Sequence, residues 1–496
     1  MMRKNADVLV IAPPDDGDGE RYGGYRPGLG ATVQHSLFRK MVGYLLDVGV
    51  DIAFDDQEQF PTEVPGDTSA YKAIMVAAYD LPRLKPKLTG YEGLAEWQFT
   101  RPDRSTTFRH TSGGPWLLAF GFSNEFFYYA NLPIETFMIA AGLTRSSARL
   151  RERLLARDDR ALQAAMVERV MRTDRCDFTD VCSYLAKSLL GAFDVTHDRA
   201  ILEHVHWIYR RALENVEFAD GRPRRKQACA GTPIDFGFYL SVPTLVKLHR
   251  LDPKAEYEAA LKHSFDGALD RLEVTRNWAP WPKGLHGAVG ILAYHNRLAE
   301  FEDRILRYAR AGYDALHDPK THLWKYFYYA DCNPPTTAFF PTHGPALALA
   351  HLVEVLEHYP RELPGYRLFL DMFVELASAV RDRQDSATGA WHCLLDAPTA
   401  CSRVDYTAMF AFSFLKGVRE GWLDQSFRAS ALNAWPFVKT HVFQGGSFGN
   451  FGGIGHSFNF DYYLMRPAIY DYLQAPPAHV LMPLSEVLRL EQGTHD

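Results

Sequence analysis

The chain has 496 residues, of which 47% are hydrophobic, and a formal net charge of -6. This length and composition predict a globular protein of two or three domains, and the slight acidic excess argues against nucleic acid as a partner. The six cysteines form no paired Cys-x-x-Cys elements, so we expect no zinc, no other metal and no cofactor.

The N-terminus reads as a first strand rather than a signal peptide, because its short apolar run is followed directly by acids. No run approaches 18 apolar residues, so we expect no membrane span. The six cysteines in so long a chain fit a reducing compartment. The sequence therefore predicts a cytoplasmic protein.

Residues 1–145 differ in pattern from the rest of the chain. Apolar runs typical of buried strands alternate with a helical pattern, which favours a small α/β domain with a parallel sheet. Residues 84–114 are polar and are expected to form a loop or hairpin. The predicted strands are 7–14, 50–56, 71–80 and 115–122, and the predicted helix is 31–49.

The segments VGVDI and YKAIMV in this half resemble the glutamine-amidotransferase-like domains that are appended to some glycosidases. No cysteine occurs between residues 1 and 145, so an amidotransferase nucleophile is absent. We therefore expect this domain to be structural or to cap the substrate.

Residues 146–496 carry a repeat in which a polar residue begins an apolar helix. Successive starts lie 51 to 62 residues apart, and a period near 50 marks a repeat architecture. Each of these helices is apolar all round and must therefore be an inner helix. The six starts are Asp180, Asp235, His286, His343, Asp405 and Asp461.

More polar, amphipathic segments alternate with these helices, at about 148–172, 200–216, 254–274, 299–316, 364–384 and 424–440. Six inner helices ringed by six outer ones form an (α/α)6 toroid. The polar starts would then gather at one mouth of the ring, where we expect the functional site.

Two loops support the repeat, because both read Asp-x-x-Thr-x-x-Trp. They begin at Asp318 and Asp385 and end at Trp324 and Trp391. We expect the Asp and Thr side chains of these loops to stabilise turns by hydrogen bonds to the backbone.

The stretch 384–424, with QDSATGAWHCLLD followed by VDYTAMFAFSFLKGVREGWLD, resembles the unsaturated glucuronyl and unsaturated rhamnogalacturonyl hydrolases. Residues 452–467 resemble the C-terminal segment of the same families. The resemblance implies an (α/α)6 barrel and substrates that are oligosaccharides capped by an unsaturated uronic acid. It also implies a protonated Asp that gives its proton to C4 of a C4=C5 double bond, while water adds at C5.

The segment 232–238 (TPIDFGF) resembles the family's HD-x-GF, which makes Asp235 a catalytic candidate. The family's Asp at the third helix start is absent here, and its W-x-RGNGW at the fourth reads FPTHGP. His286 and His343 occupy matched positions in consecutive repeats, and imidazole exchanges protons near neutral pH. With Asp405 at the fifth helix start, these residues complete the acid and base candidates.

Substrate-binding candidates are cations and rings expected at the same mouth. A cation can bind a carboxylate substrate, and aromatic rings can stack on sugar faces. Several of these side chains could equally serve packing. The candidates are Lys283, Trp281, Trp324, Tyr326, Arg403, Tyr406 and His456.

The leading hypothesis is a glycoside hydrolase that releases a terminal uronic acid, including the 4,5-unsaturated form, from oligosaccharides. One alternative is a lyase, dehydratase or epimerase that uses the pair of His286 and His343. A second alternative is a non-catalytic sugar-binding protein. The expected partner is an oligosaccharide, without nucleic acid or membrane, and homo-oligomer formation stays open.

Overall fold

In a computed structural model of the chain, the structure describes residues 6–11, 52–53, 61–78, 80–98, 106–120, 152, 155–171, 180–214, 216–219, 222–225, 242–278, 283–398, 402, 404–440 and 477–493. The chain divides into two compact units. The first contains residues 1–157, 439–452 and 464–476, and the second contains residues 158–438, 453–463 and 477–496.

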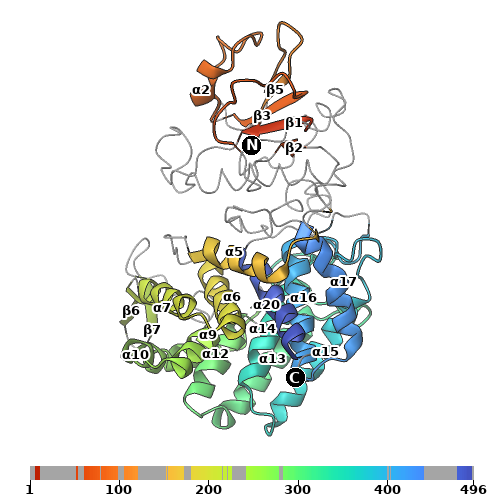
Figure 1. The fold of residues 1–496 in the computed structure, drawn as a ribbon. Helices are drawn as coiled ribbons and strands as arrows, with labels where there is room; N and C mark the ends of the chain where they lie inside the picture. Colours follow the sequence, from red (N-terminus) through yellow and green to blue (C-terminus); the bar gives the residue numbers. More distant parts are fainter. Residues whose placement is uncertain are drawn as a thin grey trace. The chain divides into compact units, whose positions relative to one another are not determined.

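In the described part of the first unit, five strands form one sheet in the order β2-β1-β3-β5-β4 (Figure 1). All neighbours pair in parallel except β4, which runs antiparallel to β5 at the edge. The continuous apolar runs VLVI and AIMVA are fully buried, as expected of central parallel strands. The strands are β1 (Val8–Ile11), β2 (Ile52–Ala53), β3 (Ala73–Ala77), β4 (Thr106–Phe108) and β5 (Trp116–Phe120).

Each of the four predicted strands contains one of the parallel strands. The segment predicted as a loop or hairpin holds α2 (Leu81–Leu84), a 3-10 turn η2 (Lys85–Lys87) and the edge strand β4. Leu81 and Leu84 pack on the sheet in the same apolar core as Ile74 and Leu117. The helix predicted at 31–49 lies outside the described residues, so the α/β layering of this unit stays a prediction.

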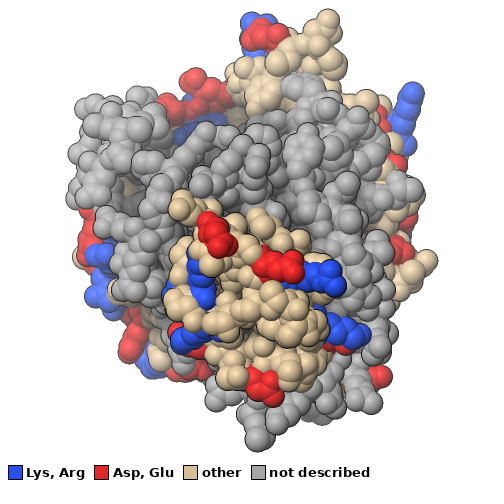
Figure 2. Space-filling model, turned by 90° about the horizontal axis from the view of Figure 1, so that it is seen from above, with Lys and Arg blue, Asp and Glu red and all other residues tan. Residues whose placement is uncertain are grey.

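Opposite charges are paired on this unit. Glu63 binds both Arg83 (2.9 Å) and Lys87 (2.5 Å), and Lys72 binds Asp7 (3.0 Å). Figure 2 shows acidic and basic side chains interspersed over the described part of the face it presents. The described surface in this view therefore offers no broad patch of a single sign.

The second unit is helical. Among its described residues, six helices contact one another in sequence, and the last contacts the first, so that they close a cycle. This cycle agrees with the predicted (α/α)6 toroid. The helices are α6 (Asp180–Thr196), α9 (Val242–Leu251), α12 (Lys283–Tyr294), α14 (His343–His358), α16 (Val404–Arg419) and α20 (Pro477–Gly493).

Amphipathic helices pack on the outside of this cycle. Along α14 every residue from Gly344 to Leu356 is buried, whereas α7 and α13 bury one face only. The outer helices are α5 (Asp159–Met171), α7 (Arg199–Glu214), α10 (Ala255–His263) with α11 (Phe265–Asp270), α13 (Glu302–Leu316), α15 (Pro364–Arg381) and α17 (Gln425–Thr440), in good agreement with the predicted segments.

Short elements connect these helices. A 3-10 turn η4 (Ala299–Phe301) precedes α13. The hairpin strands β6 (Val216–Ala219) and β7 (Arg222–Arg225) follow α7, and β8 (Asn277–Trp278) pairs with β9 (Tyr328–Tyr329). No helix in the described ranges is both long and apolar enough to cross a membrane.

Three helix starts need comment. The sixth place in the cycle is taken by α20, which the sequence analysis did not identify, and the predicted start at Asp461 lies outside the described residues. The same is true of Asp235, because the described part of α9 begins at Val242. α12 begins at Lys283, so His286 lies one turn inside the helix rather than at its start.

The two repeat loops have the predicted turn structure. Thr321 donates its backbone N–H and its hydroxyl to Asp318, and the Thr388 hydroxyl donates to Asp385. These hydrogen bonds from threonine hold the pKa of both carboxyl groups below their usual range. The carboxylates therefore stabilise turns.

Candidate functional site

His343 lies between two tyrosine rings at the mouth formed by the starts of the inner helices. It is the first residue of α14, and its ring stacks on Tyr326, with centroids 4.3 Å apart and planes inclined by 23°. On its other side Tyr406, from the first turn of α16, stacks with centroids 5.2 Å apart. The structure thus brings together three of the predicted site residues from two consecutive repeats.

Gly344 explains why the Tyr326 segment lies so close to the start of α14. A Cβ atom on this residue would lie 2.9 Å from Tyr326 Cα, which is closer than real Cβ atoms approach backbone. Only glycine lets the two backbones meet at this distance. The sequence His-Gly at the helix start therefore fixes the imidazole against the Tyr326 ring.

Asp405 lies in the first turn of α16 and is only 1% exposed. Its Oδ1 accepts the backbone N–H of Tyr406 at 3.0 Å. A carboxylate in the first turn of a helix is stabilised by the helix dipole and by free N–H groups. Asp405 therefore lies at the predicted mouth, directly beside a ring that contacts His343.

Lys325 is a mouth residue that the sequence analysis missed. It precedes Tyr326, and its Nζ lies 3.3 Å from the centroid of the Phe340 ring and 3.4 Å from the Phe339 carbonyl oxygen. Burial lowers the pKa of Lys325 to about 8, although the Asp396 and Asp318 carboxylates act in the opposite direction. Its position between two predicted site residues, Trp324 and Tyr326, was the signal available in the sequence.

The predicted pairing of His286 with His343 is wrong. His286 is buried and stacks on His351, with centroids 4.2 Å apart, and its Nε2 lies 3.6 Å from Glu354 Oε2. His351 lies eight residues beyond His343 on α14, which is about 12 Å along a helix. The two predicted partners therefore lie at different depths of the helical unit.

Trp324, one of the predicted substrate-binding residues, packs in the core instead. Its side chain is 1% exposed and packs edge-on against Tyr313, with centroids 5.6 Å apart, so its ring offers no face to a sugar. The equivalent Trp391 is also buried and donates to the Val380 carbonyl at 2.7 Å. Both tryptophans anchor their repeat loops to the core.

Five predicted site residues remain untested by these contacts. Lys283 is the first residue of α12, and nothing is described of its side chain. The other four lie outside the described residues, namely Asp235, Trp281, Arg403 and His456.

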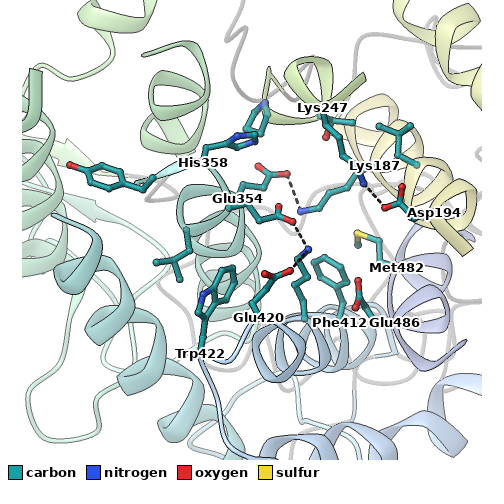
Figure 3. Close-up of a pocket in the computed structure, with 18 of the residues that line it drawn as sticks. Lys187, Asp194, Lys247, Glu354, His358, Phe412, Glu420, Trp422, Met482 and Glu486 are labelled. Carbon is teal, nitrogen blue, oxygen red and sulfur yellow. Dashed lines mark hydrogen bonds and ion pairs between the residues drawn. The ribbon is translucent and has the colours of Figure 1, made fainter. Parts of the chain in front are cut away.

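A pocket of about 700 Å³ opens at the other end of the inner helices. Its lining comes from the second halves of α6, α14 and α16 and from α9 and α20. Figure 3 shows charged side chains from several of these helices turned towards one another, among them Lys187 and Glu354.

These charges form ion pairs that link the inner helices around the ring. His286 adds α12 to the same network through Glu354. The pairs are Lys187–Glu354 (2.9 Å) between α6 and α14, Lys416–Glu357 (2.5 Å) between α16 and α14, Arg419–Glu486 (2.7 Å) between α16 and α20, Arg489–Asp194 (2.6 Å) between α20 and α6, and Lys247–Asp194 (2.5 Å) between α9 and α6.

The same ion pairs determine the protonation state of Glu357. Burial would raise the pKa of Glu357, but the Lys416 and Lys187 ammonium groups hold it well below the ordinary carboxyl range. A carboxylate held ionised by such partners is a poor general acid at neutral pH. The ion pairs of this pocket therefore hold the inner helices together, and Glu357 is a poor candidate for a general acid.

Comparison with known proteins agrees with this architecture. Residues 188–490 match Glycosyl Hydrolase Family 88. No curated protein matches the chain.

Among solved structures, a possible member of the GH105 family from Klebsiella pneumoniae has a TM-score of 0.53 at 17% identity, over 67% of this chain and 94% of that chain. A glycosyl hydrolase of family 88 from Bacteroides vulgatus has a TM-score of 0.50 at 15% identity, over 66% and 99%. A polysaccharide lyase has a TM-score of 0.52 at 16% identity, over 66% and 98%.

At these identities the structures show a shared fold, and hydrolases and a lyase both have it, so the fold alone does not choose the reaction. The family match covers more than half of the chain. The protein is a glycoside hydrolase. It belongs to glycosyl hydrolase family 88.

Proposed function

We propose that this enzyme releases a terminal uronic acid, including the 4,5-unsaturated form, from oligosaccharides at the mouth formed by the starts of its inner helices. The observation that carries the proposal is the grouping of His343, Asp405 and Tyr406 at that mouth in a chain of this family. The segments 384–424 and 452–467 support the substrate class by their resemblance to unsaturated uronyl hydrolases.

The reaction needs one group that gives a proton and one that directs water. In the unsaturated substrate a proton adds to C4 and water adds its oxygen to C5, and the resulting hemiketal opens and releases the sugar. We assign the role of the base that directs water to Asp405, whose ionised form the helix start favours, and the proton donation to Asp235, the latter on the family resemblance alone, with His343 as their partner. Carboxyl and imidazole groups are the usual general acids and bases.

Substrate binding needs a cation for the uronate and rings for the sugar faces. Lys325 is the described cation nearest to Tyr326 along the chain, and we assign it the uronate contact that an arginine makes in the family's fourth motif. Tyr326 and Tyr406 are buried, flank His343 and would orient its imidazole. Lys283, Trp281, Arg403 and His456 stay substrate-binding candidates on the sequence pattern.

The two alternatives make different demands. A lyase or epimerase built on His286 and His343 needs both imidazoles at one substrate carbon, and the separation of their rings disfavours it. A non-catalytic sugar-binding protein would bind the oligosaccharide without turnover.

The test is to incubate the purified protein with a panel of unsaturated uronyl disaccharides and with matching saturated uronyl glycosides. Loss of the near-ultraviolet absorbance of the C4=C5 bond, abolished in both Asp405→Asn and Asp235→Asn, would support hydration. Sugar release from the saturated glycosides alone would replace hydration by direct hydrolysis. Binding without turnover across the whole panel would contradict the proposal.

A further inference from the structure

Three side chains with metal-binding atoms meet between α13 and α15. His317 follows α13, His322 lies in the first repeat loop, and Glu375 lies on α15. The distance from His317 Nε2 to Glu375 Oε2 is 3.3 Å, and that from His322 Nδ1 to Glu375 Oε1 is 2.9 Å. The three ligand atoms all lie within 4.8 Å of one another.

The second repeat loop, which begins at Asp385, has the same turn but lacks the two histidines. Gln384 precedes Asp385 as His317 precedes Asp318, and it pairs with Ser430 of the next outer helix, α17. Gly389 stands at the position of His322. A neutral Gln, Gly and Ser therefore maintain the same loop, so two histidines and a glutamate are not needed for the fold.

The backbone of His322 strengthens this comparison. Its φ is +58°, in the left-handed region that Gly389 occupies with a φ of +76°. A residue with a Cβ costs about 1 kcal/mol more than glycine in this conformation. The presence of histidine at position 322, where the second loop has Gly389, indicates a functional role for the imidazole.

A supporting shell holds the other two ligands. The Tyr313 hydroxyl donates to Glu375 Oε2 at 2.6 Å, and its ring stacks on His317 with centroids 4.3 Å apart and planes inclined by 15°. Partners that orient an imidazole and a carboxylate are typical of metal sites. His317 and Glu375 are partly buried, whereas the His322 side chain is 54% exposed, which leaves access for an ion.

We propose that His317 Nε2, His322 Nδ1 and the Glu375 carboxylate bind a divalent transition-metal ion of the Zn²⁺ type. Zinc bonds to histidine nitrogen and carboxylate oxygen are about 2.0–2.2 Å long, so tetrahedral ligand atoms lie about 3.3 Å apart. The observed separations need only small side-chain rotations to reach this arrangement. The bound ion would fasten the loop before Lys325 and Tyr326 to α15.

The test uses the full-length protein, stripped of metal with a chelator and titrated with Zn²⁺ alone by calorimetry. The double variant His317→Gln/His322→Gly carries the residues of the second loop and should fold, because glycine suits the backbone of position 322. Asp371→Asn, also on α15 but paired with Arg367, is the matched control. Circular dichroism checks the fold of each variant.

The proposal expects one Zn²⁺ per chain in the wild type and in the control, with affinity at least 100-fold weaker in the double variant. Zn²⁺ should raise the midpoint of thermal unfolding of the wild type and leave that of the double variant unchanged. Glu375→Gln, which keeps the hydrogen bond from Tyr313, should also lose the zinc-dependent rise. Equal zinc binding by the wild type and the double variant, or none by the wild type, would overturn the proposal.

Discussion

Replacing Lys325 by methionine tests whether the buried ammonium group at the mouth lowers the free energy of unfolding. The pKa of Lys325 is lowered from 10.5 to about 8, chiefly by burial. At about 1.4 kcal/mol per pH unit, this difference corresponds to a cost of about 3 kcal/mol for keeping the folded side chain charged below pH 8. Between pH 8 and 10.5 the unfolded chain binds the proton and the folded chain does not, so the cost declines as pH rises.

Lys325→Met should therefore increase the free energy of unfolding by up to about 3 kcal/mol at pH 7 and by only about 1 kcal/mol at pH 9.5. Urea unfolding of both proteins at the two pH values measures this difference, and titration of other groups cancels in the comparison. The same variant should raise KM for a uronyl substrate, because the cation for its carboxylate is lost. A variant that is less stable than the wild type at pH 7, or a gain that does not shrink at pH 9.5, would refute the reasoning.

Three further predictions concern stability and its relation to activity. Glu486→Gln leaves Arg419 and Arg489 without their shared carboxylate and should cost about 3–5 kcal/mol in urea unfolding. Glu258→Gln, which removes an exposed ion pair, should have a much smaller effect; equal effects would mean that the ion pairs between the inner helices contribute little. Gly344→Ala should lower kcat and cost about 1–3 kcal/mol, because its Cβ forces Tyr326 away from His343; an unchanged kcat would show that the stacking is not needed. Trp324→Phe should destabilise the fold by about 1–3 kcal/mol, and Trp391→Phe should do the same, with KM unchanged in both; a raised KM would restore Trp324 as a sugar contact.

The helical architecture was predictable because inner and outer helices differ in hydrophobic pattern. The sequence of α14, a helix buried on all sides, is largely apolar, whereas that of α13, which buries one face, alternates apolar and polar residues. This contrast recurs along the chain. α20 was missed because Ser485, Glu486 and Arg489 give it a polar stripe. Glu486 and Arg489 of this stripe form ion pairs with α16 and α6, and such contacts cannot be read from the local sequence pattern.

The candidate site was predictable only where it follows from helix starts. His343, Asp405 and Tyr406 begin consecutive helices of a ring, so their meeting follows from the repeat. The depth of His286 depends on the stagger of α12 against α14, which the sequence of neither helix specifies. Likewise His322 and Glu375 are 53 residues apart on different elements, and only the packing of the outer helices brings them together.

The most direct test of the account compares one substitution at each end of the inner helices in the same assay. The assay follows loss of the double-bond absorbance of an unsaturated uronyl disaccharide by the wild type, by Asp405→Asn at the mouth, and by Glu357→Gln in the pocket. We expect Asp405→Asn to bind the disaccharide without turning it over, and folded Glu357→Gln to retain activity. Activity that survives in Asp405→Asn and disappears in folded Glu357→Gln would move the active site to the pocket and contradict the account.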